Sequence, residues 1–248
     1  ILEAMVARLW KEMLGQEIKT PFVRMPYREA MDRFGSDKPD VRFGLELRDI
    51  STVFEKSEFQ VFQKALAPGA RGGRGSLRGI VVPSMAEKFS RKDLDELQSH
   101  ISTYGAKGLL WIKVQAGGEL QSPAAKFFTD SEKADLKKSL NLKEGDLALV
   151  VADPKNKVVY DSLGALRLAL GEKLKLIPAL GQGTPAFLWV VDFPLVEYDE
   201  KEGRYFALHH PFTSPRPRFF ADFVAGKNLD AIEASAYDLV LNGVEIGG

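Results

Sequence analysis

Two adjacent histidines offer the densest source of chemistry in the sequence, which has only three histidines in all. They are His209 and His210, followed by Pro211, Phe212 and Thr213. Imidazoles serve as proton carriers and as metal ligands. Because successive residues of a strand point to opposite faces, at most one of the pair can face a given ligand. The alternative is that both are ordinary edge histidines beside a proline that ends the strand.

Glu245 is the second candidate, because it interrupts an otherwise apolar strand, residues 244–247. A buried carboxylate without a partner is costly, so Glu245 either serves a site or faces solvent. A zinc site at the histidines would also need Glu245, Asp192 or Asp238, and one histidine with several carboxylates suits Mg²⁺ or Mn²⁺ better. The chain has no cysteine, which excludes disulfides, thiolate metal sites and cysteine nucleophiles and favours a reducing cytoplasm.

A third candidate is the glycine- and arginine-rich run at residues 69–75. It lacks the lysine and the serine or threonine of a phosphate-binding loop, and it does not open a helix after a strand. Together with Arg78, its Arg71 and Arg74 could contact an RNA backbone. A solvated hairpin tip is the alternative. The lysines at 133, 137 and 138 are expected on the wet face of a helix.

The composition of the chain excludes several classes of protein. The chain has 248 residues, of which 45% are hydrophobic and 27% are charged, as in globular domains. Its 34 basic residues balance 34 acidic ones, so no overall field attracts nucleic acid or membrane. The longest apolar runs, 147–152 and 187–191, are far shorter than the ~20 residues that span a bilayer. No membrane contact is therefore expected.

The ends of the chain must supply the elements that position the histidines and Glu245. Apolar spacing predicts helices over residues 1–14 and 27–34, each closed by a glycine. Strands are expected over 187–199 and 205–210. Asn242 and Gly243 predict a two-residue turn between strands 237–241 and 244–246.

The middle of the chain alternates strands with helices, which indicates a small α+β or α/β module. Ser90 and Asp93 have the spacing of a capping box at the start of its first helix. The expected order is strand 77–82, helix 92–104, strand 109–114, helix 132–140, strand 146–152 and helix 162–173. One core is expected to contain Leu94, Leu97, Ile101, Leu109, Ile112, Leu147, Leu149 and Val151.

Several motifs resemble the catalytic domain of bacterial-type aspartyl-tRNA synthetases, a class II family. They are residues 191–195, Glu197, Gly203 and Arg204, 209–215 and 236–248, with 27–31 and 34–40 earlier in the chain. Between these motifs, residues 105–109, 112–114, 122–127 and 163–167 resemble the insertion called the GAD domain, which a tRNA-dependent amidotransferase subunit also carries. The resemblance covers essentially the whole chain.

The resemblance implies that aspartate is activated with ATP and Mg²⁺ to aspartyl adenylate and then transferred to tRNA. It implies that His209 contacts aspartate with His210 beside it, and that Glu245 lies at ATP and its metal. No residue is assigned as a covalent catalyst. The implied partners are aspartate, ATP and tRNA(Asp), with tRNA(Asn) left open, and a second copy in a homodimer of the full-length enzyme.

The resemblance also implies an organisation into three segments of an α+β fold. Residues 1–45 and 176–248 would be parts of an antiparallel catalytic sheet, and 46–175 would be the GAD insertion. The family's anticodon-binding barrel and first two class II motifs would precede Ile1, and its third motif would follow Gly248. We therefore expect the chain alone to be inactive. The alternative function is a noncatalytic, RNA-contacting amidotransferase subunit with a GAD domain, against which residues 209–215 argue.

Overall fold

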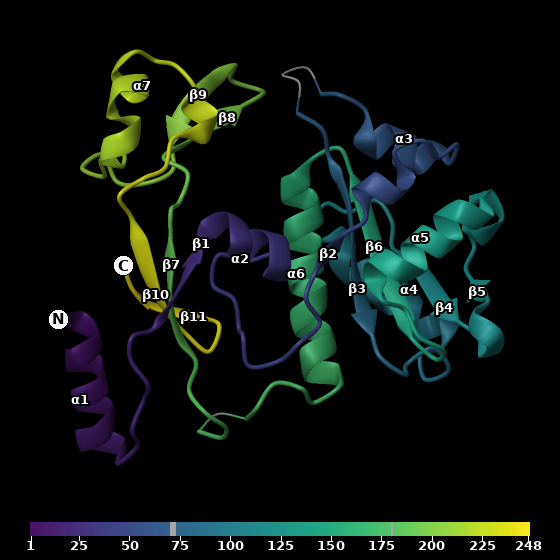
Figure 1. Ribbon diagram of the computed structural model, residues 1–248, viewed down its shortest axis with the longest axis horizontal. Helices are drawn as coiled ribbons and strands as arrows, with labels where there is room; N and C mark the ends of the chain where they lie inside the picture. Colours follow the sequence, from purple (N-terminus) through teal and green to yellow (C-terminus); the bar gives the residue numbers. More distant parts are fainter. Residues whose placement is uncertain (70–72, 180) are drawn as a thin grey trace. The chain divides into compact units, whose positions relative to one another are not determined.

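The computed structural model describes residues 1–69, 73–179 and 181–248, which form two compact units of an α+β fold (Figure 1). The flanking unit contains Ile1–Ala30, Asp37–Arg42 and Ala179–Gly248. The inserted unit contains Met31–Ser36 and Phe43–Pro178. In the described part of the chain, no helix is long and apolar enough to cross a membrane.

The inserted unit is built on a five-stranded sheet in the order β2-β3-β6-β4-β5, with all neighbours antiparallel. Its strands are β2 (Arg48–Asp49), β3 (Ser76–Val82), β4 (Leu110–Val114), β5 (Leu120–Gln121) and β6 (Leu147–Asp153). Its α-helices are α3 (Gln60–Leu66), α4 (Arg91–Ser102), α5 (Asp130–Leu140) and α6 (Asn156–Lys173). Short 3₁₀ turns lie at Ser51–Phe54, Ala116–Gly118 and Ala125–Phe127.

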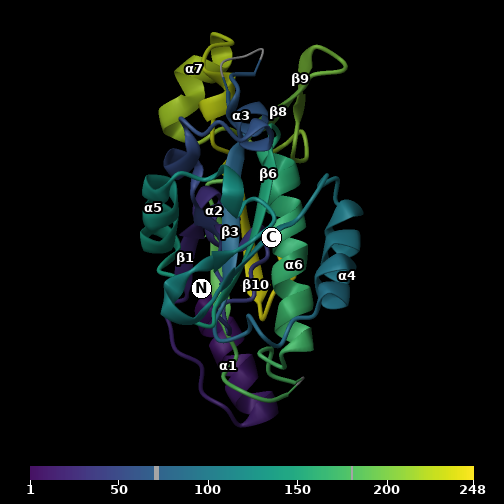
Figure 2. The ribbon, with the colours of Figure 1, turned by 90° about the vertical axis from the view of Figure 1, so that its right-hand side faces the viewer.

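Helices cover both faces of this sheet and create two core layers, as Figure 2 shows for α4 and α6 on one side and α5 on the other. Leu149 and Val151 of β6 pack with α4 and α6, whereas Ala148 and Val150 pack with α3 and α5. The expected single core is therefore wrong for Ile112, which lies in the second layer. It follows Trp111 in β4, and successive strand residues point to opposite faces.

Local signals fix the helix ends in the inserted unit. The predicted capping box is confirmed, because the Ser90 hydroxyl accepts from the Asp93 amide and the Asp93 carboxylate accepts from the Ser90 amide. Thr129 and Glu132 form a second capping box at α5. Lys173 pairs with Asp93 at 2.6 Å, and this hydrogen bond, before those from Ser90, lowers the pKa of Asp93.

Arg78 does not fit the RNA contact that the sequence left open, because its side chain is buried. Its guanidinium pairs with Asp32 at 2.7 Å and Asp49 at 3.0 Å and lies over the Tyr160 ring. The Tyr160 hydroxyl donates to Asp32 as well, and burial raises its pKa more than that hydrogen bond does. Arg74 pairs with Glu55 at 2.7 Å, and Arg71 lies outside the described residues.

Helix α6 also holds the segment that precedes β2. A Cβ on Gly164 would lie 2.4 Å from the Gly35 carbonyl oxygen, so the two backbones touch only because both residues are glycines. Farther along α6, the buried guanidinium of Arg167 donates to the carbonyls of Phe43 and Gly44 at 2.7 and 3.1 Å. These contacts hold Gly35, Phe43 and Gly44 against α6 within the inserted unit.

The flanking unit contains a four-stranded sheet in the order β1-β7-β10-β11. Its strands are β1 (Val23–Pro26), β7 (Phe187–Val191), β10 (Tyr237–Leu241) and β11 (Val244–Gly247); β1 and β7 are parallel and the other pairs antiparallel. A separate hairpin joins β8 (Val196–Asp199) and β9 (Arg204–Ala207). The helices are α1 (Leu2–Leu14), α2 (Tyr27–Phe34), which continues into the inserted unit, and α7 (Phe220–Val224), and 3₁₀ turns lie at Pro217–Phe219 and Leu229–Ala231.

The predicted hairpin at Asn242 and Gly243 is confirmed, with φ values of 53° and 84° at the turn. Two predicted strands are too long. The strand expected over 187–199 is interrupted at residues 192–195, where Asp192 has a φ of 60° and Pro194 cannot donate to a ladder. The strand expected over 205–210 ends at Ala207, so both histidines lie in the loop that follows it.

Candidate functional site

The β10–β11 hairpin places two carboxylates on one face of the flanking sheet. Val240 of β10 lies opposite Glu245 of β11, and Asp238 lies two residues before Val240 on the same face. A bulge between Leu239 and Val240 changes the register at this point. The turn and the alternation of the strand thus bring Asp238 and Glu245 to one face.

Lys38 adds a cation to this face. Its ammonium pairs with Glu245 at 2.6 Å, and this hydrogen bond raises the pKa of Lys38. Asp238 is half-buried, and burial, followed by the charges of Glu245 and Asp37, raises its pKa. Lys38 and His209 have the opposite effect on Asp238. These charges act on one another, so the side chains share one electrostatic environment. We call this group the carboxylate site; its members are Asp37, Lys38, His209, Asp238 and Glu245.

A short loop positions Lys38 next to the hairpin. The buried Asp40 carboxylate accepts hydrogen bonds from the backbone amide and the guanidinium of Arg42 at 2.7 to 3.0 Å. A Cβ on Gly243 would lie 2.9 Å from the Asp40 Cβ, so the hairpin turn approaches this loop closely at a glycine with positive φ. The same residue thus allows both the turn and the contact.

His209 is half-buried and is held from two sides. Its Nε2 lies 3.0 Å from the Pro194 carbonyl, and its ring meets the Phe193 ring edge to face. A carbonyl oxygen only accepts hydrogen bonds, so Nε2 carries the proton in this contact. Nδ1 is then the nitrogen of the ring without a proton.

His210 is exposed, and its environment differs from that of its neighbour. Its Nδ1 lies 3.3 Å from the Phe212 amide, which donates to it, and its ring packs edge to face with Phe212. His209, in contrast, is one of the charges that act on Asp238. Although the histidines are not in a strand, the loop still separates their surroundings.

Three ion pairs connect the segment that contacts His209 to Arg216, Arg218 and Glu233. Arg216 pairs with Asp192, immediately before Phe193 and Pro194, and also contacts Glu233 at 3.5 Å. Arg218 pairs with Glu233 as well. Asp192 was a candidate metal ligand, but here it is the anionic partner of Arg216.

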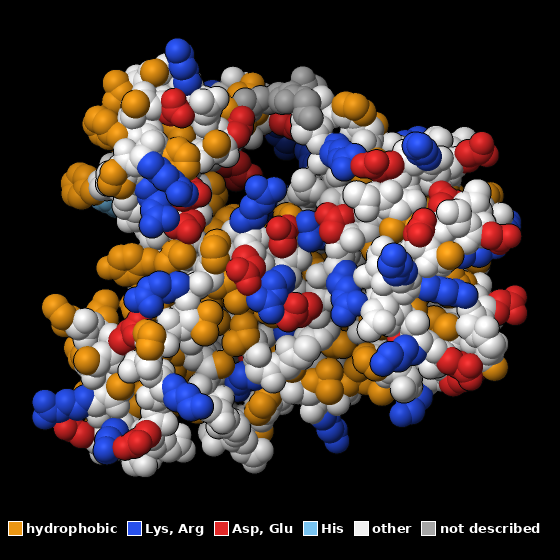
Figure 3. All heavy atoms as spheres, viewed as in Figure 1, with side chains coloured by type: hydrophobic (Ala, Val, Ile, Leu, Met, Phe, Trp, Pro, Cys, Tyr) orange, Lys and Arg blue, Asp and Glu red, His pale blue; other side chains and the backbone are white. Residues whose placement is uncertain are grey.

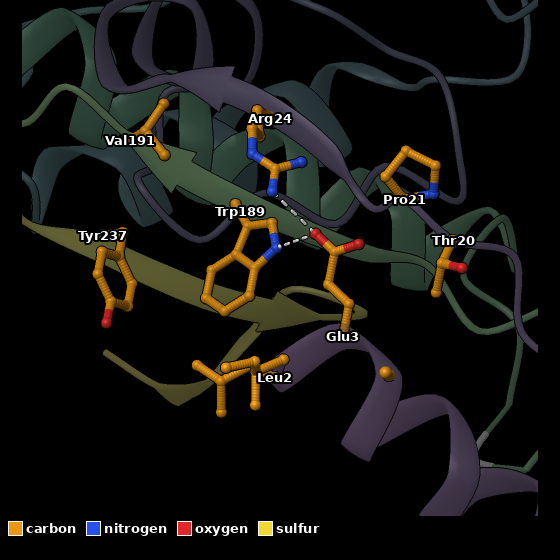
Figure 4. A pocket seen from close by; sticks show the side chains of 10 residues that line it. Leu2, Glu3, Thr20, Pro21, Arg24, Trp189, Val191 and Tyr237 are labelled. Atoms are coloured by element: carbon orange, nitrogen blue, oxygen red, sulfur yellow. Dashed lines mark hydrogen bonds and ion pairs between the residues drawn. The ribbon is translucent and has the colours of Figure 1, made fainter.

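A cavity of about 740 Å³ in the flanking unit lies on the other face of the sheet. Trp189, Val191 and Tyr237 line it, and Tyr237 alternates with Asp238 along β10. Figure 4 shows Glu3 between Trp189 and Arg24, with hydrogen bonds of 2.8 and 3.0 Å. The pKa of Glu3 is lowered chiefly by its Trp189 bond. This cavity is therefore separate from the carboxylate site.

The carboxylate site does not by itself provide a full set of metal ligands. Among the described residues, no group of three histidine, aspartate or glutamate side chains could hold an ion. Mg²⁺ is commonly bound by one or two carboxylates together with phosphates and waters. Asp238 and Glu245 are two carboxylates on this face, and the pKa of Asp238 is raised first by burial and then by the negative charges of Glu245 and Asp37.

Lys38 and Asp37 are the site residues to which the sequence analysis gave no role. A signal for them existed, since both lie in the motif at residues 34–40 that carries part of the family resemblance. Asp238 was weighed only as a zinc ligand. The contact with Glu245 depends on the fold, because more than 200 positions separate it from Lys38.

The chain is similar to known proteins over its whole length, and one part of it matches a domain family. Residues 62–163 match the GAD domain family. The "Aspartate–tRNA ligase" of Geobacillus kaustophilus (strain HTA426) is 50% identical over 248 residues, which is 100% of this chain and 40% of the relative. The "Aspartate–tRNA(Asp/Asn) ligase" of Anoxybacillus flavithermus (strain DSM 21510 / WK1) is 49% identical over 252 residues, with the same coverage.

The chain thus spans about 40% of the length of the curated relatives that it matches. A match that extends from one end to the other includes the loop with both histidines and the β10–β11 hairpin, which lie outside the GAD match. An amidotransferase subunit is therefore not favoured. By its sequence, the chain is similar over its whole length to part of bacterial aspartate–tRNA ligases, and residues 62–163 match the GAD domain family.

Proposed function

We propose that the chain contributes the aspartate contact and part of the ATP contact of a class II aspartate–tRNA ligase. The observation that supports this most directly is the grouping of His209, Asp238, Glu245 and Lys38 in one electrostatic environment. In this proposal, residues 1–45 and 176–248 belong to the catalytic domain and 46–175 form the GAD insertion.

The reaction joins aspartate first to the AMP part of ATP and then to tRNA. An oxygen of the aspartate α-carboxylate bonds to the α-phosphorus of ATP, while the bond from that phosphorus to the bridging oxygen breaks and pyrophosphate leaves. The terminal ribose hydroxyl of tRNA then attacks the activated carbonyl carbon, loses its proton, and AMP leaves. No covalent enzyme intermediate is needed, so the protein contributes positioning and electrostatic stabilisation.

Each residue then has a separate role. His209, held through Nε2 by the Pro194 carbonyl, offers Nδ1 to aspartate, and His210 supports the loop beside it. Asp238 and Glu245 would hold Mg²⁺, which neutralises phosphate charge when bound. Lys38 pairs with Glu245 and is placed to contact phosphate oxygens. The substrates would be aspartate, ATP and tRNA(Asp) or tRNA(Asn), in a cytoplasmic homodimer.

An exchange of segments tests the aspartate contact. These 248 residues would replace the matching segment of the Geobacillus ligase, and aspartate-dependent ATP–pyrophosphate exchange would be measured. His209→Ala is expected to raise KM for aspartate by ~5 to 150-fold, the effect of losing a contact worth ~1 to 3 kcal/mol, with little change for ATP. His210→Ala is the control and should have a smaller effect. The aspartate assignment fails if only the His210 variant impairs aspartate use.

A second pair of variants in the same enzyme tests the ATP contact. Glu245→Gln keeps the size of the side chain and removes its charge, so exchange should fall about tenfold or more and require more Mg²⁺. Glu202→Gln, at an exposed turn position of the same unit outside the family motifs, is the matched control. Equal exchange rates and equal Mg²⁺ dependence in the two variants would contradict a role for Glu245 at ATP.

A further inference from the structure

The inserted unit contains a cavity of about 660 Å³ that the proposed ligase reaction does not use. It lies beside the end of β6, where the register with β3 continues to Asp153 but the register with β4 stops at Val150. Helices α3 and α4 and the segment 107–111 form its walls. All of its lining residues belong to the inserted unit.

The floor of the cavity is apolar and partly aromatic. Phe62, Leu94, Leu109 and Val150 are buried side chains that line it, and Trp111 is half-buried. Among the described residues, the Trp111 indole N–H has no hydrogen-bond partner. Cavities of this size with an apolar lining and a few polar groups are typical of sites for small ligands. An indole provides both a stacking surface and a donor.

The rim of the cavity is positive. Lys64, Arg91 and Lys107 are exposed cations that line it. Arg91 is compensated by Asp95 at 3.2 Å, whereas no described residue pairs with Lys64 or Lys107. The buried Asp153 carboxylate already accepts a hydrogen bond from the Lys155 amide. Two ammonium groups thus remain for an anionic part of a ligand.

We propose that this cavity binds a nucleoside phosphate, with the base against the apolar floor near Trp111 and the phosphate at Lys64 and Lys107. Stacking on an aromatic side chain combined with neighbouring cations is the usual way in which proteins hold unpaired nucleotides. The ligand can be a free mononucleotide or one nucleotide of a single-stranded RNA. This inference does not rest on the function proposed above, because none of its residues belongs to the carboxylate site.

The test follows the Trp111 indole signal by nitrogen–proton NMR in the 248-residue chain, titrated separately with AMP and with single-stranded hexa-adenylate. The chain has three tryptophans, and Trp111→Phe identifies the signal. A saturable shift with AMP indicates a free mononucleotide, and a shift with the hexamer alone indicates RNA. Both outcomes support the site. No shift with either probe would overturn it.

A matched pair of double variants separates a site from general attraction between charges. Lys64→Ala with Lys107→Ala should weaken binding about tenfold or more, because charge-assisted contacts to phosphate are strong. Lys88→Ala with Lys138→Ala removes the same charge from exposed positions of the same unit outside the cavity. This control should change affinity by less than about twofold. Equal losses in the two double variants would contradict the proposal.

A third variant fills the cavity without changing charge. Gly108 lines it, and a Cβ there meets no atom within 4 Å, so Gly108→Leu can be accommodated. We expect this variant to lose binding of the probe while its unfolding midpoint stays within a few degrees of the parent. Asp238→Asn serves as the control at the carboxylate site and should leave the Trp111 titration unchanged. Unaltered binding in Gly108→Leu would overturn the proposal.

Discussion

The two units of the molecule bury their apolar side chains to different extents. All of the largest fully buried side chains, among them Phe54, Phe62, Leu147 and Leu149, lie in the inserted unit. Most of the large apolar side chains that are exposed lie in the flanking unit, including Met13 at 77%, Phe212 at 91% and Val224 at 69%. Figure 3 shows apolar side chains gathered over the region of α7.

The difference follows from how each sheet is covered. Helices pack on both faces of the inserted sheet, so its central strands β3 and β6 are each buried at six of their seven positions. In the flanking unit, α1 packs on one face through Val6 and Trp10, and no residue of α1 is buried. A unit assembled from three segments of chain thus has less core per strand than the almost continuous inserted unit.

The largest expected effect concerns local stability. Native-state hydrogen exchange should show opening free energies for β3 and β6 that exceed those for β10 and β11 by several kcal/mol, because the most buried elements open only with global unfolding. Exchange resolved by NMR or mass spectrometry measures both sets of amides in one sample. Equal protection of the two sheets would mean that buried area does not control their stability.

A cavity in the inserted core should be costly. Leu149→Ala removes a fully buried side chain and is expected to lower the free energy of unfolding by ~2 to 5 kcal/mol. Leu168→Ala, at a position of α6 that is 44% exposed, is the control and should cost less than ~0.5 kcal/mol. Urea unfolding of the 248-residue chain measures both. Similar losses would contradict the core described for β6.

A smaller effect is expected where α6 touches the segment before β2. Gly164→Ala would place a methyl group 2.4 Å from the Gly35 carbonyl oxygen, so one backbone must move, at a cost of ~1 to 3 kcal/mol. Gly44→Ala adds the same group where nothing lies within 4 Å. Thermal unfolding compares the two. If Gly164→Ala were as stable as Gly44→Ala, the close contact would be ruled out.

The α4 capping box should have a modest effect on stability. Ser90→Ala is expected to cost ~1 kcal/mol in urea unfolding, because the Asp93 amide loses its acceptor. Ser102→Ala, in the last turn of the same helix, is the control, because its hydroxyl donates only to a carbonyl within that turn. Equal losses would show that the cap does not contribute.

The smallest expected effect is on how the stability of the inserted unit depends on pH. Hydrogen bonds from Lys173 and Ser90 lower the pKa of Asp93 below its unfolded value of ~3.9. The folded state therefore favours the ionised carboxylate, and this stabilisation is complete above about pH 4 and is lost as the pH falls through the folded pKa. Asp93→Asn should flatten the fall in melting temperature below pH 4. An unchanged acid profile would exclude this contribution.

Sequence patterns predicted the elements with strong local signals. The helix over residues 27–34, the capping box at Ser90 and the turn at Asn242 and Gly243 appear in the structure as expected. Helix α3, strand β1 and the short strands β2 and β5 were not predicted, because segments of two to seven residues have too little periodicity to be distinguished from loops. Their formation depends on neighbours elsewhere in the chain.

The candidate site likewise has residues that the sequence predicted and contacts that only the structure shows. The residue types and motifs singled out His209, His210 and Glu245, and the resemblance to the ligase family gave them roles that are still predictions. The pairing of Glu245 with Lys38, the raised pKa of Asp238 and the carbonyl contact of His209 come from the structure. None of these contacts has a local signature, because the partners lie in different segments of the chain.

The sequence by itself determined the similarity to aspartate–tRNA ligases, the α+β class, the turn of the β10–β11 hairpin and the ends of helix α4, because each depends on short motifs of residues close together in the chain. Only the tertiary structure decided that Ile112 lies in a second core layer, that Arg78 is buried and that Lys38 meets Glu245. The physical reason is that pairing across a sheet and packing between distant segments depend on the register and the close approach of backbones, which no short stretch of sequence contains.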